Sequence, residues 1–133
     1  MPIFTQELHA DLPVLVISGE LDLSTQSGLH DALASIDSTA PAVMIDLCKC
    51  KYFDSSAIAE MIRFYKARSG RQQIMLSAPS ETAQRILRIT GLDRLIPMVE
   101  CTHTHRWRLR EERDDKRLRR HVRLVGEVPE RFG

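Results

Sequence analysis

The chain has 133 residues, of which 43% are hydrophobic and 28% are charged, and its formal net charge is +1. These values are typical of one globular domain, and so small a net charge gives no general attraction to nucleic acid or to anionic membranes. No apolar run approaches the roughly 18 residues that a membrane span needs, and the N-terminus lacks the apolar core of a signal peptide. We therefore expect a cytoplasmic protein with no membrane span and no direct contact with nucleic acid.

The first part of the chain has the pattern of a β-hairpin followed by a helix. Residues 3–9 and 14–17 read as strands, and the turn between them ends at Pro13. Ser24 or Thr25 can cap the helix that follows. The apolar residues of that helix recur at helical spacing and indicate a face packed in the core; they are Leu29, Ala32, Leu33 and Ile36.

The stretch from residue 43 to residue 70 is the centre of the predicted fold. The apolar run at 43–47 is typical of a strand buried on both faces. Downstream, apolar side chains recur at i, i+3, i+4 and i+7, which predicts one face of a helix that Gly70 can close; they are Ile58, Met61, Ile62 and Tyr65. Asp54, Ser55 and Ser56 fall at the start of this helix, where backbone N–H groups have no partner within the helix.

Two further strands are predicted, at 74–76 and 95–99, with a helix between them. Ser80 can cap that helix, Gly91 can end it, and Pro97 predicts an edge position for the last strand. Strands joined through helices run parallel by right-handed crossovers, whereas the first hairpin is antiparallel. The predicted fold class is therefore α/β, with a single mixed, mostly parallel β-sheet packed against α-helices.

The C-terminal part of the chain differs in composition. Residues 106–133 hold ten basic and six acidic side chains, a net charge of +4, whereas residues 1–105 carry −3. We expect a domain over residues 1–110 and a charged, Arg-rich extension over 111–133, in which a solvated helix is followed by a loose end. Residues from about Arg119 should be dispensable for folding. A docking arm for an acidic partner and a weak nucleic-acid contact are the alternatives for this extension.

The reactive side chains do not form the motif of a known catalytic or metal site. The sequence has no G-x-S-x-G elbow to make a nucleophile of Ser55, no Gly-rich phosphate loop and no His-Glu metal pattern. Cys48 and Cys50 are too close for a comfortable disulfide, and with Cys101 they make an odd number, so reduced thiols are expected. We therefore predict that the protein is not an enzyme and holds no metal or cofactor. A triad with Ser55 and Asp54 would need a histidine, and none of the five falls in a motif-like setting; they are His9, His30, His103, His105 and His121.

Three short motifs occur in order along the chain. They are Gly-Glu-Leu-Asp at 19–22, Phe-Asp-Ser-Ser-Ala-Ile at 53–58 and Thr-Gly-Leu-Asp at 90–93. Together they resemble the STAS family, named for sulfate transporters and anti-sigma-factor antagonists, over about residues 3–110. The resemblance implies a STAS-like domain with a last helix near Trp107 and Leu109. Ala57 stands where the family usually has Gly, and alanine favours the helix more strongly than glycine does.

The resemblance implies a stand-alone anti-sigma-factor antagonist that acts by partner switching. In similar proteins the unphosphorylated antagonist binds an anti-sigma factor, which then releases its sigma factor. That anti-sigma factor is also a serine kinase, and a serine phosphatase reverses the modification. Carried over by motif position, the phosphorylation site is Ser55, with Ser56 as the fallback.

The same resemblance implies a partner-binding face made of the first two motifs, with Gly19, Glu20, Asp22, Asp54, Ser55, Ser56 and Ala57. The alternative is a non-phosphorylated STAS scaffold subunit in a lipid-transport or other signalling complex.

Overall fold

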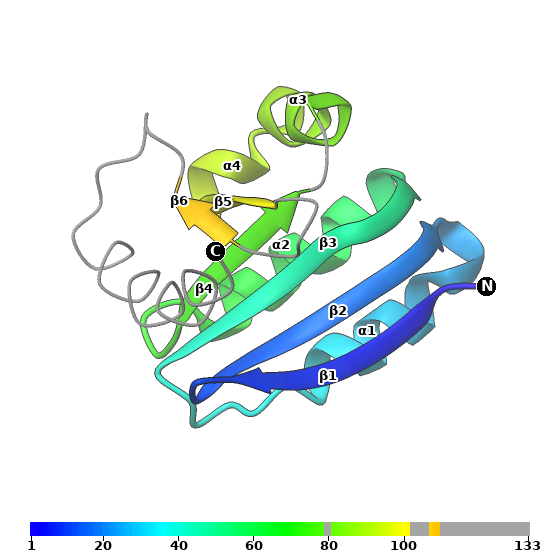
Figure 1. Ribbon diagram of the computed structural model, residues 1–133. Coiled ribbons are helices and arrows are strands. Elements are labelled where there is room, and N and C mark those ends of the chain that lie inside the picture. The colour runs from blue at the N-terminus through cyan, green and yellow to red at the C-terminus, as the bar shows by residue number, and fades with distance from the viewer. Residues whose placement is uncertain (79–80, 102–106, 110–133) are drawn as a thin grey trace.

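The computed structural model describes residues 1–78, 81–101 and 107–109, which form one β-sheet with helices packed against it (Figure 1). The strands are β1 (Ile3–His9), β2 (Leu12–Leu21), β3 (Ala42–Phe53), β4 (Gln73–Ala78), β5 (Met98–Cys101) and β6 (Trp107–Leu109). The helices are α1 (Gln26–Ala34), α2 (Ser55–Arg68), α3 (Glu81–Thr90) and α4 (Leu92–Leu95), with a 3₁₀ turn, η1 (Leu23–Thr25), before α1.

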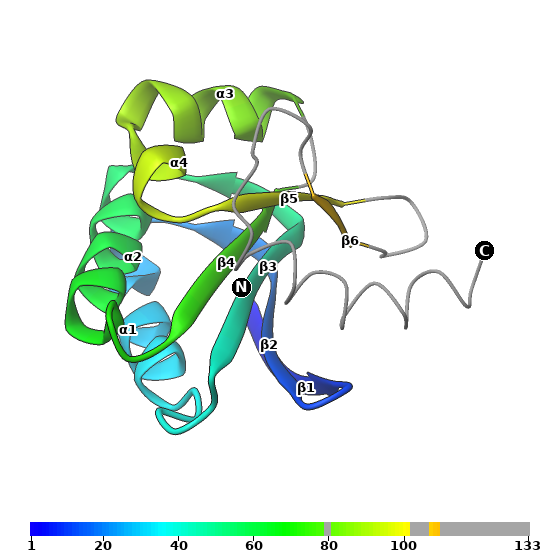
Figure 2. The same ribbon diagram turned by 90° about the vertical axis from the view of Figure 1, so that its left-hand side faces the viewer.

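The sheet is mixed and mostly parallel, as the sequence predicts. Its described strands lie in the order β1-β2-β3-β4-β5-β6. The three inner pairs are parallel, and the two outer pairs, β1–β2 and β5–β6, are antiparallel. Figure 2 shows α1 and α2 side by side on one face of the sheet. The carboxyl ends of β2 and β3 therefore lie together, beside the start of both helices.

The central strands are buried on both faces, which explains their nearly continuous apolar sequences. In β3, Val43, Ile45 and Leu47 belong to the core between the sheet and the helices. Met44 alternates with them and joins a second apolar cluster on the other side of the sheet. All four side chains are completely buried. The prediction of a doubly buried strand at 43–47 is thus confirmed.

The strand β3 continues to Phe53, well beyond the predicted 43–47. Its second half pairs with the end of β2, from Ser18 opposite Lys49 to Leu21 opposite Phe53. One register shift lies just before Ser18 and a second lies between Gly19 and Glu20. Lys49 on this half is exposed while Phe53 is buried. The shifts break the simple alternation of polar and apolar residues, so this half did not have the pattern of a strand.

Three sequence predictions are wrong at the C-terminal side of the sheet. The predicted strand at 95–99 begins only at Met98, because Leu92–Leu95 form α4. Pro97 precedes β5 and accepts a hydrogen bond from the Leu76 N–H at 3.0 Å, and β5 lies between β4 and β6 rather than at an edge. Trp107–Leu109 form a strand that pairs with β5, instead of a helix. The Ser80 cap and the extension 111–133 lie outside the described residues.

Cysteine chemistry also differs from the expectation. Cys48 is disulfide-bonded, so the prediction of reduced thiols is wrong for this residue. Cys50 is a buried free thiol, and burial raises its pKa. None of the described helices is long and apolar enough to cross a bilayer. The described residues contain no cluster of three or more side chains suited to hold a metal ion.

Candidate partner-binding site

The parallel pairing of β2 with β3 brings the first two sequence motifs together. Leu21, in the first motif, lies opposite Phe53, in the second. The Asp54 N–H then donates to the Leu21 carbonyl at 3.2 Å, one residue past both strands. The third motif has a structural role. Gly91, with φ of 82°, separates α3 from α4, and Leu92 is fully buried. The first two motifs therefore share one edge of the molecule, and the third builds the core.

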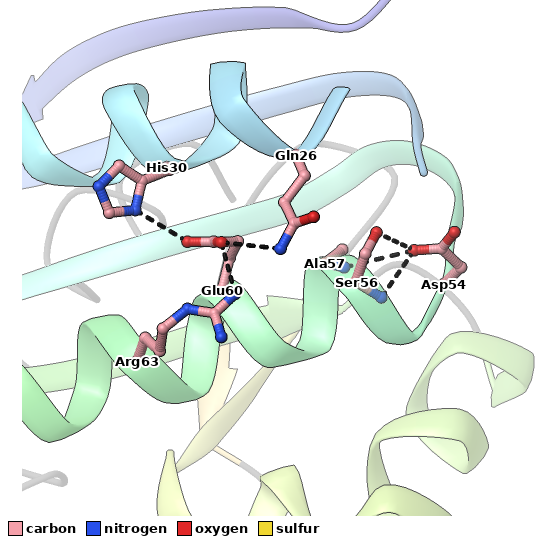
Figure 3. A network of polar contacts seen from close by, with 7 residues as sticks. All are labelled: Gln26, His30, Asp54, Ser56, Ala57, Glu60 and Arg63. Atoms are coloured by element: carbon pink, nitrogen blue, oxygen red, sulfur yellow. Dashed lines mark hydrogen bonds and ion pairs between the residues drawn. The ribbon is translucent and has the colours of Figure 1, made fainter. Parts of the chain in front are cut away.

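Asp54 is the N-cap of α2 (Figure 3). Its Oδ1 accepts hydrogen bonds from the Ser56 N–H at 2.9 Å, the Ser56 hydroxyl at 2.5 Å and the Ala57 N–H at 3.3 Å. The Ser56 hydroxyl is the main cause that lowers the pKa of Asp54, and the N–H groups of Ala57, Ser56 and Leu23 act in the same direction. Asp54 is thus a carboxylate that joins the start of α2 to η1.

Ser55 differs from its neighbour in how its hydroxyl is used. It is the first residue of α2 and is exposed. Within the described part of the chain its hydroxyl makes no hydrogen bond, whereas the Ser56 hydroxyl donates to Asp54. This agrees with the position of Ser55 at the start of the helix that the sequence indicates. An enzyme acting on this turn would reach the Ser55 oxygen first, since Ser56 is half-buried and already engaged.

The other predicted site residues divide into surface and structural positions. Glu20 is exposed, and Asp22 accepts a hydrogen bond from the Ser24 hydroxyl at 2.6 Å. Gly19 has φ of 93°, and a Cβ there would lie 2.9 Å from the Met1 carbonyl oxygen, so its role is to admit the N-terminal residues. Ala57 is only 1% exposed and belongs to the core. Its side chain is therefore closed to a partner in this structure.

Two exposed apolar side chains flank these motifs, and the sequence did not single them out. Leu23 follows Asp22 and is 72% exposed; Tyr52 comes two residues before Asp54 and is 52% exposed. Large apolar side chains on a surface that also carries polar motifs are typical of docking faces. Their positions next to the two motifs could have marked them as candidates for a docking face. The sequence pattern of strands and turns, however, does not show which of these side chains face solvent.

A second polar centre lies one turn further along α2. Glu60 is buried, and its carboxylate accepts from Arg63 Nη2 at 2.6 Å, His30 Nδ1 at 2.9 Å and Gln26 Nε2 at 3.0 Å (Figure 3). The hydrogen bond from Arg63 is the main cause that lowers the pKa of Glu60 to about 2; those from His30 and Gln26 add to it. Glu60 therefore carries a negative charge that joins α1 to α2.

Comparison with known proteins shows which family and which solved structures this fold resembles. The family model described as "Mlab, STAS domain" matches residues 4–100. An anti-sigma factor antagonist from Mycobacterium paratuberculosis is 25% identical; the match covers 78% of this chain and 89% of that chain, with a TM-score of 0.70. An anti-sigma-factor antagonist (STAS) domain protein from Planctomyces limnophilus is also 25% identical, covering 71% and 86%, with a TM-score of 0.55.

A sulfate transporter family protein from Wolinella succinogenes has the same fold, at 17% identity and a TM-score of 0.58, with 87% of this chain and 88% of that chain covered. The fold is thus common to proteins of different roles, and the family match extends over most of the described residues. The chain belongs to the STAS domain family.

Proposed function

We propose that this protein is an anti-sigma-factor antagonist of the bacterial cytoplasm that acts by partner switching. Unphosphorylated, it binds an anti-sigma factor that is also a serine kinase; phosphorylated on Ser55, it is released, and a serine phosphatase restores it. The observation that carries the proposal is the exposed Ser55 hydroxyl, which lies at the first position of α2, beside Asp54, and makes no hydrogen bond to any of the described residues. The anti-sigma factor antagonist from Mycobacterium paratuberculosis, which shares the fold at 25% identity, supports the same partner class.

The charges around Ser55 suit such a switch. Asp22 and Asp54 directly follow Leu21 and Phe53, which pair at the ends of β2 and β3, and Glu20 is exposed on the same strand end. A phosphate adds a charge of about −1.5 to −2 at neutral pH. The Ser56 and Ala57 N–H groups already bond Asp54, so a phosphate on Ser55 would meet a carboxylate rather than empty donors.

This extra charge would lie in a face that must lose water on docking. A loss of about 3 kcal/mol in binding free energy corresponds to roughly hundredfold weaker affinity, which is enough to release a partner. The capping bonds of α2 come from Asp54 and not from Ser55. The modification would therefore alter binding while the domain stays folded.

The test begins with capture of the partner on the full-length chain and its identification by mass spectrometry. The purified partner is then incubated with ATP and Mg²⁺ and with the wild-type chain, Ser55→Ala or the matched control Ser56→Ala. We expect one phosphate, on Ser55, in the wild type and in Ser56→Ala, and none in Ser55→Ala. Full phosphorylation of Ser55→Ala would show that the assigned acceptor is wrong.

Affinity measurements complete the test. Ser55→Ala should bind as the wild type does, and Ser55→Asp should bind more weakly, though less so than the phosphorylated chain, because it adds only one charge. Leu23→Ala should weaken binding by about tenfold or more if this exposed side chain anchors the partner. Ile89→Ala, at an equally exposed site on α3, serves as its control.

The alternative is a non-phosphorylated STAS scaffold subunit in a lipid-transport or other signalling complex. Under this alternative the chain would bind its partner with the same affinity whether or not residue 55 carries a charge. A partner without kinase activity, combined with equal affinities of Ser55→Ala and Ser55→Asp, would establish the scaffold role.

A further inference from the structure

A groove runs between α1 and α2, beyond the motifs described above. It consists of two hollows of about 470 Å³ and about 440 Å³ that share His30, Glu60 and Arg63 as lining residues. The second hollow also includes Leu23, the exposed residue that flanks the first motif of the candidate partner-binding site. The groove therefore extends from the edge of that site along the whole of α1, which at 1.5 Å per residue is about 14 Å long.

The far half of the groove is mainly apolar. Leu33 from α1 and Phe64 from α2 are buried in its floor, and Ala34 and Ala67 form low walls that leave it open. Arg68 lies over the Phe64 ring, with its guanidinium carbon 4.7 Å from the ring centroid. Such a floor, bounded by small side chains, can accept large apolar side chains from outside.

The middle of the groove presents hydrogen-bond donors. The Glu60 carboxylate lies beneath, with both oxygens occupied by Gln26, His30 and Arg63. The side chains of His30 and Arg63 are themselves 62% and 55% exposed. Each uses one nitrogen on Glu60. The other guanidinium nitrogens of Arg63 remain as donors for an incoming group, whereas His30 Nε2 is an acceptor, because Nδ1 carries the ring proton that is donated to Glu60. A ligand in the groove therefore meets N–H donors above a charge that is already paired.

We propose that the α1–α2 groove docks an amphipathic helix of a protein partner, with apolar side chains over Leu33 and Phe64 and an acidic side chain on Arg63. The open form and the length of the groove match two to three turns of a helix better than an enclosed small molecule. A carboxylate matches the donors of a guanidinium well. The groove is continuous with Leu23, so one partner could occupy both surfaces.

The experiment needs no knowledge of the partner or of phosphorylation, so it can fail independently of the function proposed above. Random peptides of about 16 residues are displayed and selected on the full-length chain, and synthetic copies of the enriched peptides are measured by fluorescence anisotropy. Two groove variants are compared: Arg63→Gln, which removes the cation, and Ala67→Trp, which fills the hollow from an exposed position without touching Glu60. The matched controls are Arg85→Gln and Glu81→Trp, both exposed on α3.

Enriched peptides should combine apolar residues at helical spacing with Asp or Glu. Each groove variant should weaken their binding by about tenfold or more, and each control should stay within about twofold of the wild type. Basic peptides, equal binding to all variants, or no peptide that binds below about 1 mM would overturn the proposal. Displacement of the selected peptides only by a medium-chain fatty acid such as decanoate would overturn it too, because it would identify a small-molecule site.

Discussion

Replacement of Glu60 by Gln tests whether the carboxylate that joins α1 to α2 is a source of stability. The substitution keeps the size of the side chain and removes its charge. In the folded protein the bonds from Arg63, His30 and Gln26 lower the pKa of Glu60 from its ordinary value of 4.5 to about 2. The folded state thus holds the proton on Glu60 more weakly than the unfolded state does.

The sign and size of the effect follow from this difference in proton affinity. A group with a lowered folded-state pKa contributes stability above its unfolded pKa, and this contribution is lost as the pH falls from about 4.5 to about 2. At about 1.4 kcal/mol for each tenfold change in affinity, the upper limit is about 3 kcal/mol. Solvent screens the exposed side chains of His30 and Arg63, so we expect about 1–2 kcal/mol at neutral pH.

The assay is urea unfolding followed by circular dichroism at pH 7 and at pH 2.5. Glu60→Gln should lower the free energy of unfolding by about 1–2 kcal/mol at pH 7. At pH 2.5 the loss should fall to about a quarter of that, because Glu60 is then protonated in the unfolded state but still mostly ionised in the folded state. Asp31→Asn, an exposed carboxylate on the same helix as His30, is the control and should change little at either pH. Equal stabilities of Glu60→Gln and the wild type at pH 7, or a difference that persists unchanged at pH 2.5, would refute this reasoning.

Two further predictions concern single residues near the candidate site. Ser56→Ala should lower the free energy of unfolding by about 0.5–1.5 kcal/mol, because it removes the 2.5 Å bond to Asp54, whereas Ser55→Ala should stay within about 0.5 kcal/mol of the wild type in the same urea titration. Gly19→Ala should lower the melting temperature much more than Gly70→Ala: both glycines have positive φ, but only at Gly19 would the Cβ meet backbone, at 2.9 Å. Similar losses at both glycines would show that the N-terminal residues move aside without cost.

The elements that could be predicted from sequence are those whose spacing of apolar residues fits only one type of secondary structure. The run at 43–47 and the stripe Ile58, Met61, Ile62 and Tyr65 each match a single period, and both elements were placed correctly. The STAS motifs also indicated which strand ends meet, because parallel strands bring their carboxyl ends to one edge. Ser55 could be placed at a helix start because the helical spacing of apolar residues begins shortly after it, at Ile58.

The parts that could not be predicted depend on contacts distant in sequence. Residues 48–53 became strand because β2 continues beside them through two register shifts, which no local pattern records. The strand predicted at 95–99 began too early, because Leu95 still belongs to α4, and Pro97 suggested an edge position that β6 fills. Trp107 was misassigned to a helix because its pairing with β5 decides its state. Glu60 lies at a helical position that reads as solvent-facing, and only the approach of α1 turns it into a buried centre.

At the start of α2, one residue caps the helix and a different residue is exposed to modification. A charge added to the exposed residue would therefore leave the capping hydrogen bonds in place. Asp54 holds the helix through the N–H groups of Ser56 and Ala57, and its lowered pKa keeps it ionised. Ser55 takes no part in these bonds and is exposed. A phosphate there would be repelled by the very carboxylate that caps the helix, so it would be directed outward, toward whatever docks on this face. The residue that stabilises the helix is in this way the one that would carry the effect of the modification to the partner.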